Sequence, residues 1–230
     1  MGWISRATGI RRWVPRATVQ FDPPVAHTLR RLARGARIAD VGAGGRRITA
    51  DTLTIDGLSG PDIDLSCDIH QIPLADSSFD CIFCTGTLQH VTDPLRVLAE
   101  IHRLLRPGGI VHVELPFLQG YHPDPRDYWR WTLPGARLAC ERVGFEHLES
   151  GTHIGPTSAL VWIAVHYVGG LLPGRLGSAV SHASRFLFRP LLVLDRLWRH
   201  NPEAQVIACG VYFVGRKAEA PDPGLSPVHP

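Results

Sequence analysis

Short apolar runs alternate with amphipathic segments along most of the chain. The runs are rich in β-branched and aromatic residues, a composition that predicts strands. They lie at residues 37–41, 52–55, 63–65, 79–85, 110–116 and 145–153, and a partly alternating segment at 205–217 predicts a seventh strand. The run FDCIFCT at 79–85 is apolar on both faces, as is expected of a central strand in a parallel sheet.

Three segments between these runs place apolar residues at three- and four-residue steps, the spacing of amphipathic helices. They are VAHTLRRLAR after Pro23 and Pro24, the segment 93–106 before a Pro-Gly-Gly, and the segment 134–145 with Gly144 near its end. Strands that alternate with helices predict an α/β fold, with a doubly wound, mostly parallel seven-stranded sheet. Only about ten residues separate the first two strands, so we expect tight turns there in place of a full crossover helix.

A long apolar insertion separates the sixth and seventh predicted strands. Residues 157–174 are strongly apolar, and residues 184–200 mix apolar side chains with four arginines. Neither segment is expected to cross a membrane, because spanning needs roughly 20 apolar residues and His166 interrupts the first run. The expected organisation is a basic N-terminal arm (1–21), a domain (22–217) with a helical insertion or cap (154–205), and a disordered Pro-rich tail (218–230).

The composition is that of a globular protein, with 44% hydrophobic and 20% charged residues. The formal net charge of +3 is mild, so no nucleic-acid partner is expected. The five cysteines are an odd number in a chain without a recognisable secretory signal, which favours reduced thiols and a cytoplasmic setting. Cys81 and Cys84 form a C-x-x-C pair inside a predicted buried strand, and no second pair could complete a zinc site. We therefore expect them in the core and expect no metal.

Glycines follow the first predicted strand in IADVGAGGRRI (38–48). Backbone N–H groups at such a turn bind anionic groups, and glycine allows close approach of a ligand. A dinucleotide fingerprint fails because Arg47 occupies the third glycine position, which disfavours a dehydrogenase. An acid-x-G-x-G pattern remains, and a second acid, Asp56, ends the second strand, where a ribose diol lies in doubly wound nucleotide sites.

An ordered series of motifs extends this pattern downstream. ADVGAGG is followed by an acid before Ile-Pro, by Ser-Phe-Asp at the fourth strand, by LQHVTDP, and by EIHRLLRPGG before the fifth strand. Together these motifs, over roughly residues 37–145, resemble the class I S-adenosylmethionine-dependent methyltransferases of the type 11 family. The resemblance implies a Rossmann-like methyltransferase fold and S-adenosylmethionine as the cofactor.

The resemblance also implies a role for each matching residue. Asp40, Gly42 and Gly44 are expected around the methionine part of the cofactor, and Thr85 and Gly86 beside it. The ribose hydroxyls are expected at Asp56, and the adenine amino group at Asp68 and Ile69. Members of the family often have a glycine at the position of Arg46, so the chain departs from the pattern there.

The loop after the fifth strand, PFLQGYHPDPRDYWRWT (116–132), resembles a type 11 subgroup and lies where an acceptor is expected to bind. His122 is the candidate base, because imidazole titrates near neutral pH, and Asp127 is the candidate to orient it. Tyr121, Tyr128 and Arg130 are candidate acceptor contacts. A structural network that locks the loop is the alternative, and a metal site from His122, Asp124 and Asp127 is disfavoured.

The expected function is methyl transfer to a small-molecule acceptor at oxygen, with a sugar or lipid-linked metabolite as the candidate class. The alternative is a non-catalytic nucleotide-binding or scaffold protein that keeps the fold. The apolar insertion suggests peripheral contact with a membrane, with arginines facing anionic lipid. A helical cap or a dimer contact is the alternative for that segment. The acceptor and the oligomeric state are not predicted.

Overall fold

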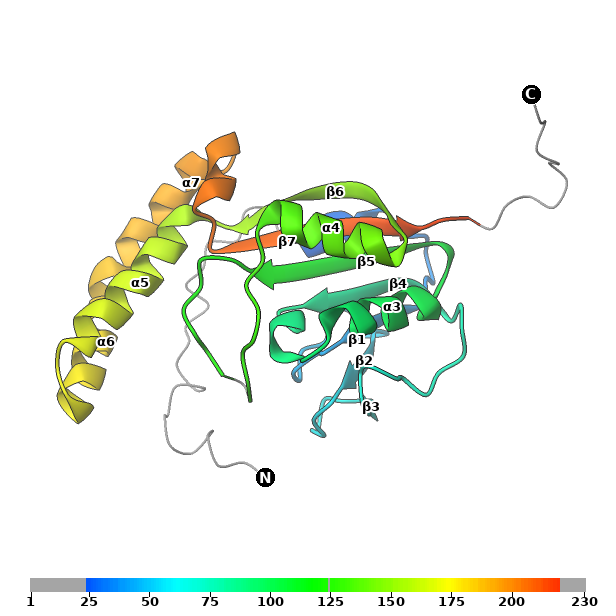
Figure 1. The fold of residues 1–230 in the computed structure, drawn as a ribbon, viewed down its shortest axis with the longest axis horizontal. Helices are drawn as coiled ribbons and strands as arrows, with labels where there is room; N and C mark the ends of the chain where they lie inside the picture. Colours follow the sequence, from blue (N-terminus) through cyan, green and yellow to red (C-terminus); the bar gives the residue numbers. More distant parts are fainter. Residues whose placement is uncertain (1–23, 124, 220–230) are drawn as a thin grey trace, which may run out of the picture.

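The computed structural model describes residues 24–123 and 125–219 (Figure 1). The predicted N-terminal arm and residues 220–230 of the predicted tail lie outside this range. A seven-stranded sheet forms the centre, in the order β3-β2-β1-β4-β5-β7-β6. The strands are β1 (Ile38–Val41), β2 (Leu53–Asp56), β3 (Leu65–Ser66), β4 (Phe79–Thr85), β5 (Leu105–Pro116), β6 (Phe145–Ile154) and β7 (Gly210–Lys217).

The first five strands pair in parallel, and β7 runs antiparallel to both β5 and β6. This arrangement confirms the predicted mostly parallel sheet. It also places the carboxyl ends of β1, β2 and β4 at one edge, because parallel strands end on the same side of a sheet. Cys81 and Cys84 are buried in β4 with free thiols whose pKa is raised by burial, in agreement with the expectation that they lie in the core.

Helices cover both faces of the sheet, as a doubly wound fold requires (Figure 1). The front face in the figure carries α3 (Pro94–Leu104) and α4 (Leu133–Val143). The apolar side of α3 enters the core: Val97, Leu98 and Ile101 are at most 1% exposed. Behind the sheet lies α2 (Pro24–Arg30), attached by a 2.8 Å hydrogen bond between Thr28 Oγ1 and His112 Nδ1.

Local sequence signals set the ends of these helices. The Asp93 carboxylate accepts a hydrogen bond from the Arg96 amide at 3.1 Å, and Pro94 occupies the first turn of α3. Thr132 caps α4 in the same way, and Gly144 ends it in the left-handed region, at φ 106°. These capping residues explain why the helix boundaries follow so closely from the sequence.

Two connections are irregular. No helix forms between β1 and β2, in agreement with the tight turns expected there. Gly42, Gly44 and Gly45 adopt φ values of 77°, 57° and 80°, a conformation that interrupts helical structure. The fifth strand begins at Leu105, earlier than the predicted residue 110, because Leu105 pairs with Phe79 before a register shift brings Ile110 opposite Cys81.

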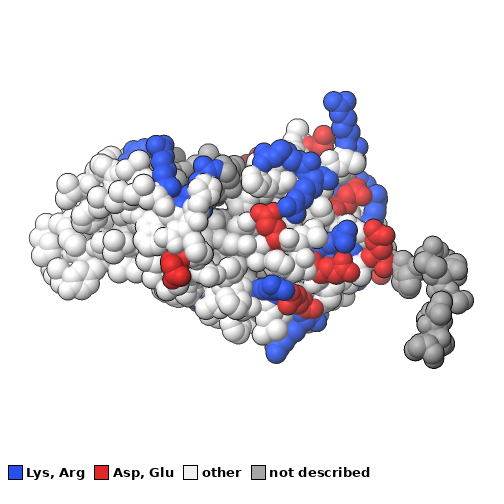
Figure 2. Space-filling model, turned by 90° about the horizontal axis from the view of Figure 1, so that it is seen from above, with Lys and Arg blue, Asp and Glu red and all other residues white. Residues whose placement is uncertain are grey.

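Five helical segments lie between β6 and β7. They are α5 (Pro156–Gly170), α6 (Gly174–Phe188), η3 (Arg189–Leu194), α7 (Asp195–Trp198) and η4 (Pro202–Val206). We call residues 156–198 the helical arm, because α5 and α6 project past the edge at which β4 and β5 end (Figure 1). Much of its surface is uncharged and its exposed charges are arginines (Arg175, Arg189 and Arg196), whereas most charged side chains gather over the sheet (Figure 2).

The arm is held together by close helix contacts and one buried acid. A Cβ atom on Gly169 would lie 1.8 Å from Ser181 Oγ, and one on Gly177 would lie 2.5 Å from the Gly169 carbonyl, so glycine allows α5 and α6 to approach. Asp195 is fully buried and accepts hydrogen bonds from the amides of Thr157 and Ser158 at 2.7 and 3.0 Å. In the part of the chain that the structure describes, we find no helix of the length and apolarity that crossing a bilayer takes.

Candidate functional site

The glycine turn after β1 packs directly against the segment that follows β4. A Cβ atom on Gly42 would lie 2.1 Å from Thr87 Cγ2, so no other residue fits there without displacing Thr87. The Thr87 hydroxyl in turn donates to the Gly42 carbonyl at 3.1 Å. Gly44 and Gly45 differ, because a Cβ atom on either would meet nothing within 4 Å. The backbone beyond Gly42 therefore borders open space.

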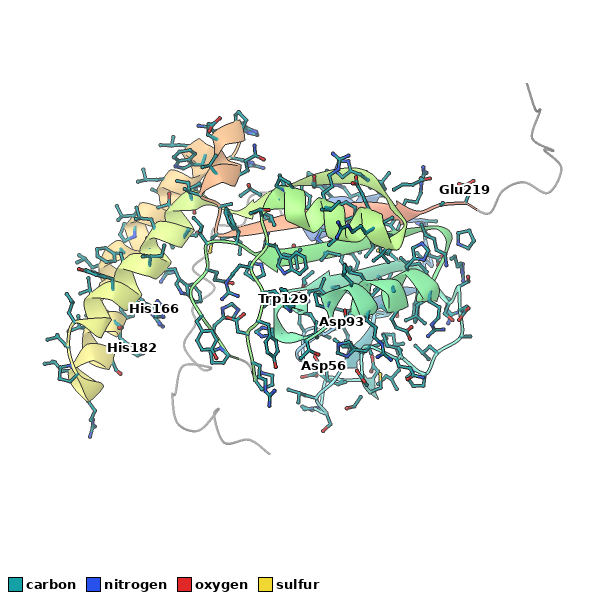
Figure 3. The ribbon with its side chains drawn as sticks, viewed as in Figure 1. Asp56, Asp93, Trp129, His166, His182 and Glu219 are labelled. Atoms are coloured by element: carbon teal, nitrogen blue, oxygen red, sulfur yellow. The ribbon has the colours of Figure 1, made fainter. Side chains whose placement is uncertain are left out.

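Asp56, at the end of β2, holds this turn in place. One carboxylate oxygen accepts from the Gly44 amide at 2.8 Å and the other from the Leu58 amide at 2.9 Å. A carboxylate has about four lone-pair sites, so each oxygen can accept one more hydrogen bond. Figure 3 labels Asp56 near the edge where the parallel strands end, on the same side of the molecule as Trp129.

The two arginines after the glycines have different partners. Arg47 forms a bidentate pair with Asp64, at 2.9 and 3.0 Å, and donates to the Thr52 carbonyl at 2.6 Å, which closes the β1–β2 connection. Arg46 folds back instead, with its Nη2 2.9 Å from Asp40 Oδ2. Asp40 is fully buried, and burial raises the pKa of its carboxyl although the Arg46 charge acts in the opposite direction.

Several buried polar atoms at this edge have no partner among the described residues. They are Asp40 Oδ1 on β1, Thr85 Oγ1 on β4 and Gln89 Oε1 in η2 (Leu88–His90). Gln89 is tied to the same edge, since its Nε2 donates to the Gly86 carbonyl at 2.9 Å. Unpaired buried polar atoms are uncommon in native proteins. Their position beside the open glycine turn indicates a binding site for a polar ligand.

Asp68 and Ile69 follow β3. Asp68 is largely exposed, and its Oδ1 accepts from the His70 amide at 2.9 Å and lies 2.7 Å from His70 Nδ1, contacts that lower the pKa of the carboxyl. Ile69 is buried. An open groove of about 810 Å³ starts beside them, between residues 67–74 and α3. Asp40, Gly44, Asp56 and Thr85 are not among the residues that line this groove, so it borders the strand-end site without belonging to it.

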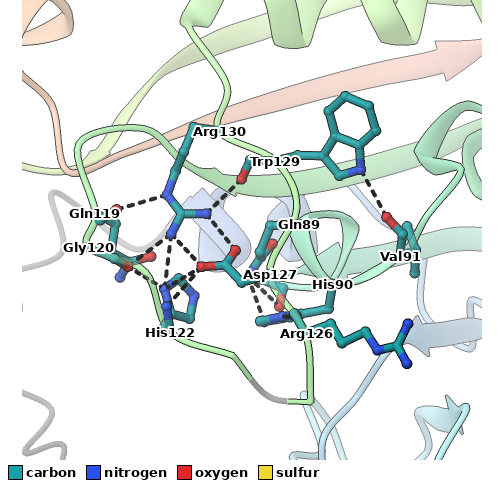
Figure 4. Close-up of polar contacts among 11 residues, drawn as sticks. Gln89, His90, Val91, Gln119, Gly120, His122, Arg126, Asp127, Trp129 and Arg130 are labelled. Carbon is teal, nitrogen blue, oxygen red and sulfur yellow. Dashed lines mark hydrogen bonds and ion pairs between the residues drawn. The ribbon is translucent and has the colours of Figure 1, made fainter.

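The β5–α4 loop (residues 117–132) is built around a buried ion pair (Figure 4). The Asp127 side chain is fully buried and forms a bidentate pair with Arg130, with both contacts at 2.5 Å. Arg130 also donates to the carbonyls of Gln119 and Gly120 at 2.8 and 2.9 Å. Burial acts to raise the pKa of Asp127, but the hydrogen bonds from Arg130 and the His122 amide lower it overall. These contacts favour the structural role for Asp127 and Arg130.

His122 lies where the loop meets η2 and α5. Its Nδ1 is 2.8 Å from the Gly120 carbonyl, which can only accept, so Nδ1 carries the proton and Nε2 keeps a lone pair. Burial lowers the pKa of the imidazole, which favours this neutral form. Its ring centroid lies 5.4 Å from that of His90 and 6.1 Å from that of Trp162 on α5. Asp127 Oδ2 accepts from the His122 amide at 2.9 Å and lies 3.5 Å from the ring Nδ1, so the carboxylate holds the backbone more closely than the ring.

The two tyrosines predicted to contact an acceptor are both exposed. Tyr121 is 73% exposed and Tyr128 is 43% exposed. The amide of Tyr128 donates to the Gln89 carbonyl at 2.7 Å, which fastens the loop to η2. Asp124 lies outside the described residues, and within residues 24–123 and 125–219 no cluster of three or more His, Cys, Asp or Glu side chains could hold a metal ion.

A buried polar cluster lies behind the sheet and was not predicted from the sequence. Glu114 is 7% exposed and pairs across the sheet with Thr85, at the same edge as the glycine turn. His112 Nε2 lies 3.3 Å from Glu114 Oε1, and His153 Nε2 lies 3.8 Å from Glu114 Oε2. His153 Nδ1 is buried without a partner among the described residues. The alternation of apolar and polar residues in IVHVELP was the sequence signal for this cluster, because it places His112 and Glu114 on one face of β5.

Comparison with known proteins gives one match to a protein family. The model described as a methyltransferase domain matches residues 40–113. The ubiquinone/menaquinone biosynthesis C-methyltransferase UbiE of Desulfotalea psychrophila is 30% identical over 91 residues, which are 37% of this chain and 37% of that protein. The tRNA U34 carboxymethyltransferase of Campylobacter curvus is 29% identical over 92 residues, 35% of this chain and 31% of that protein. The chain thus spans about a third of the length of these curated relatives.

Solved structures resemble the chain over most of its length. The crystal structure of Burkholderia thailandensis 1,6-didemethyltoxoflavin-N1-methyltransferase, with bound 1,6-didemethyltoxoflavin and S-adenosylhomocysteine, aligns with a TM-score of 0.59 at 19% identity, covering 94% of this chain and 85% of that one. A possible histamine N-methyltransferase of Thermotoga maritima aligns with a TM-score of 0.54 at 15% identity, covering 91% and 95%. At these identities the likeness shows a shared fold.

Proposed function

Residues 40–113 make this chain a member of the methyltransferase domain family, and we propose that it transfers a methyl group from S-adenosylmethionine to a small-molecule acceptor. One observation carries the proposal. The strand-end edge combines the open backbone of Gly44 with the buried, unpartnered oxygens of Asp40 and Thr85, which suit a ligand with several hydrogen-bond donors. The Burkholderia structure of the same fold, with its bound S-adenosylhomocysteine, supports the choice of ligand.

The residues at this edge fit each part of the cofactor. Asp56 can accept hydrogen bonds from the ribose hydroxyls through the lone pairs that the Gly44 and Leu58 amides leave free. Asp40 Oδ1 can accept from the methionine ammonium, and the exposed side of Arg46 can pair with the methionine carboxylate. The exposed oxygen of Asp68 can accept from the adenine amino group. When bound, S-adenosylmethionine supplies an electrophilic methyl group.

The residues of the β5–α4 loop suit an oxygen acceptor. His122 Nε2 can take the proton of an acceptor hydroxyl, since the neutral imidazole is held by its Nδ1–H bond to the Gly120 carbonyl. The rings of His90 and Trp162 beside it can pack on the face of a sugar or an apolar acceptor. Catalysis then depends mainly on holding acceptor and methyl group in line. The mild net charge supports a small molecule rather than a nucleic acid as acceptor.

One observation favours the alternative of a non-catalytic, cofactor-binding scaffold. The ion pair between Arg46 and Asp40 occupies the turn where family members often have glycine. The two functions differ in turnover. Incubating the protein and isotope-labelled S-adenosylmethionine with cell extract, then searching for labelled metabolites and lipids by mass spectrometry, should reveal a methylated product that a His122→Gln variant forms much more slowly. Cofactor binding without any labelled product would favour the scaffold.

A further inference from the structure

The helical arm exposes an apolar stripe to solvent. On α5, Leu160, Ile163, Tyr167 and the following Leu171 are 64%, 52%, 68% and 65% exposed. Their spacing of three and four residues places them on one side of the helix. The other side packs against α6, through Gly169 and Val165. A helix that is apolar all round is usually buried all round or in contact with lipid, and α5 is buried on one side only.

The rest of the arm continues this surface. Of the 21 exposed large apolar side chains among the described residues, 12 lie in residues 156–198. Besides the α5 stripe and Leu172 they are Leu176, Phe186, Leu187, Leu191, Val193, Leu194 and Leu197. Phe186, Leu187 and Leu197 are 64%, 72% and 78% exposed. Contiguous apolar surface of this extent on a globular domain marks an interaction site.

The charges of the arm all have one sign at the surface. Residues 156–198 contain four arginines and a single acid, Asp195. Asp195 is fully buried, and its carboxylate accepts hydrogen bonds from the Thr157 and Ser158 amides at the start of α5. Arg175, Arg189 and Arg196 are exposed. In Figure 2 the red side chains gather mostly over the sheet, away from the arm. The partner of this surface must therefore have an apolar region that can bury the leucines and negative charges that can pair with the arginines.

We propose that the helical arm docks onto the surface of an anionic lipid bilayer. A bilayer supplies hydrocarbon for the leucines and anionic headgroups for the arginines. A second copy of the arm would bring arginines against arginines without an acid to pair with them. The N-terminal residues 1–21 carry Arg6, Arg11, Arg12 and Arg16 and no acid, so they offer no negative charge either.

The arm lies in the interface and does not cross it. Helix α5 has 15 residues and is about 22 Å long at 1.5 Å per residue, shorter than the roughly 30 Å hydrocarbon core. Trp162 of α5 contacts the His122 ring at 6.1 Å between centroids, so docking would turn the β5–α4 loop toward the headgroups. This docking stands apart from methyl transfer and would hold for a non-catalytic protein as well.

Co-sedimentation of the full chain with vesicles tests the docking. The protein should sediment with vesicles of phosphatidylcholine and phosphatidylglycerol, should stay mostly in solution with phosphatidylcholine alone, and should be released by salt. The double variant Phe186→Glu, Leu187→Glu should lose at least about a hundredfold in partition coefficient, the loss expected when two large apolar side chains are no longer buried in lipid. Arg175→Gln and Arg189→Gln should each cost about fivefold.

A matched control changes two exposed leucines over the sheet. Leu138 on α4 and Leu148 on β6 are 50% and 38% exposed, and the double variant Leu138→Glu, Leu148→Glu should sediment like the parent protein. Equal loss in both double variants, or equal binding to neutral and anionic vesicles, would overturn the proposal. Light scattering tests for a dimer. If the parent protein is a dimer that does not bind vesicles, and the double variant Phe186→Glu, Leu187→Glu is a monomer, the arm is a contact between two copies of the chain instead. Circular dichroism should show the parent spectrum for every variant.

Discussion

Arg46 closes over Asp40, with 2.9 Å between Arg46 Nη2 and Asp40 Oδ2. The Asp40 side chain is fully buried, whereas that of Arg46 is 48% exposed. One oxygen of Asp40 is left without a partner among the described residues, and the guanidinium keeps donors that face outward. The pair therefore presents a negative and a positive group side by side. That is the complement of the zwitterionic amino-acid end of S-adenosylmethionine.

Replacing Arg46 by Gln should therefore weaken cofactor binding selectively. A charged hydrogen bond contributes about 1.5–3 kcal/mol, so we expect the affinity for S-adenosylhomocysteine to fall by roughly tenfold or more. Affinity for 5′-methylthioadenosine, which lacks the amino-acid end, should change little. Isothermal titration calorimetry measures both ligands. Arg47→Gln is the control, because Arg47 pairs with Asp64 instead. Tighter binding by Arg46→Gln would mean that the arginine competes with the ligand.

Replacing Asp127 by Asn should destabilise the fold. The variant leaves the guanidinium of Arg130, 27% exposed, without its buried carboxylate partner, at a cost of about 3 kcal/mol in the free energy of unfolding. Urea denaturation measures the change. The surface pair Arg137–Glu141 gives the control, since Arg137→Ala should cost no more than about 0.5 kcal/mol. Similar losses in the two variants would show that the Asp127 pair contributes no more than a surface pair.

The methyl transfer rate should depend on pH through His122. Burial lowers the pKa of this imidazole below the usual value of about 6.5. The neutral base is then present at pH 7, and kcat/KM should fall only as the pH drops below the lowered pKa. His122→Gln should reduce kcat by about a hundredfold or more and remove this acid limb. An unchanged pH profile with activity close to that of the parent would assign His122 to structure.

The stability of the protein should fall in mild acid because of His153. Burial lowers its pKa in the folded state, so below about pH 6.5 the unfolded chain binds the proton more readily. The stabilisation is complete above that pH and is lost as the pH falls toward the folded-state pKa. Glu114 and His112 face the ring, and Glu114 opposes the shift. Denaturation at pH 7 and pH 5.5 should show a smaller loss for His153→Gln than for the parent. Equal losses would place the pH dependence in other groups, such as His102 and His122.

Local signals were sufficient for much of the fold. The strand FDCIFCT was predicted with the observed bounds, because only a central strand needs apolar residues on both faces. The end of α4 was predicted from Gly144. The absence of a crossover helix between β1 and β2 was predicted from the short stretch of chain that joins these strands. The early start of β5 was missed, because Leu105 enters the sheet through a pairing with Phe79 that is 26 residues away in the chain.

The location of the candidate site could be predicted from the sequence, whereas several of the contacts within it could not. The acids at the strand ends come together because parallel strands end at one edge, a consequence of the fold class alone. The pairing of Arg46 with Asp40 depends on how three glycines turn the chain, which no pattern of residue types encodes. The cluster around Glu114 was missed because its strand was interpreted as an apolar run, although His112 and Glu114 lie on one face of that strand, where His112 contacts Thr28 of α2.

Titration of S-adenosylhomocysteine into the protein and its Asp56→Ala variant, by calorimetry, tests the central claim most directly. Asp56 holds the Gly44 amide and is the proposed ribose acceptor, so the parent should bind in the micromolar range and the variant at least about tenfold more weakly. Asp51→Ala, a change of an exposed acid in the same connection, should bind like the parent. An absence of heat with the parent protein, or equal affinity in Asp56→Ala, would contradict the proposed cofactor site.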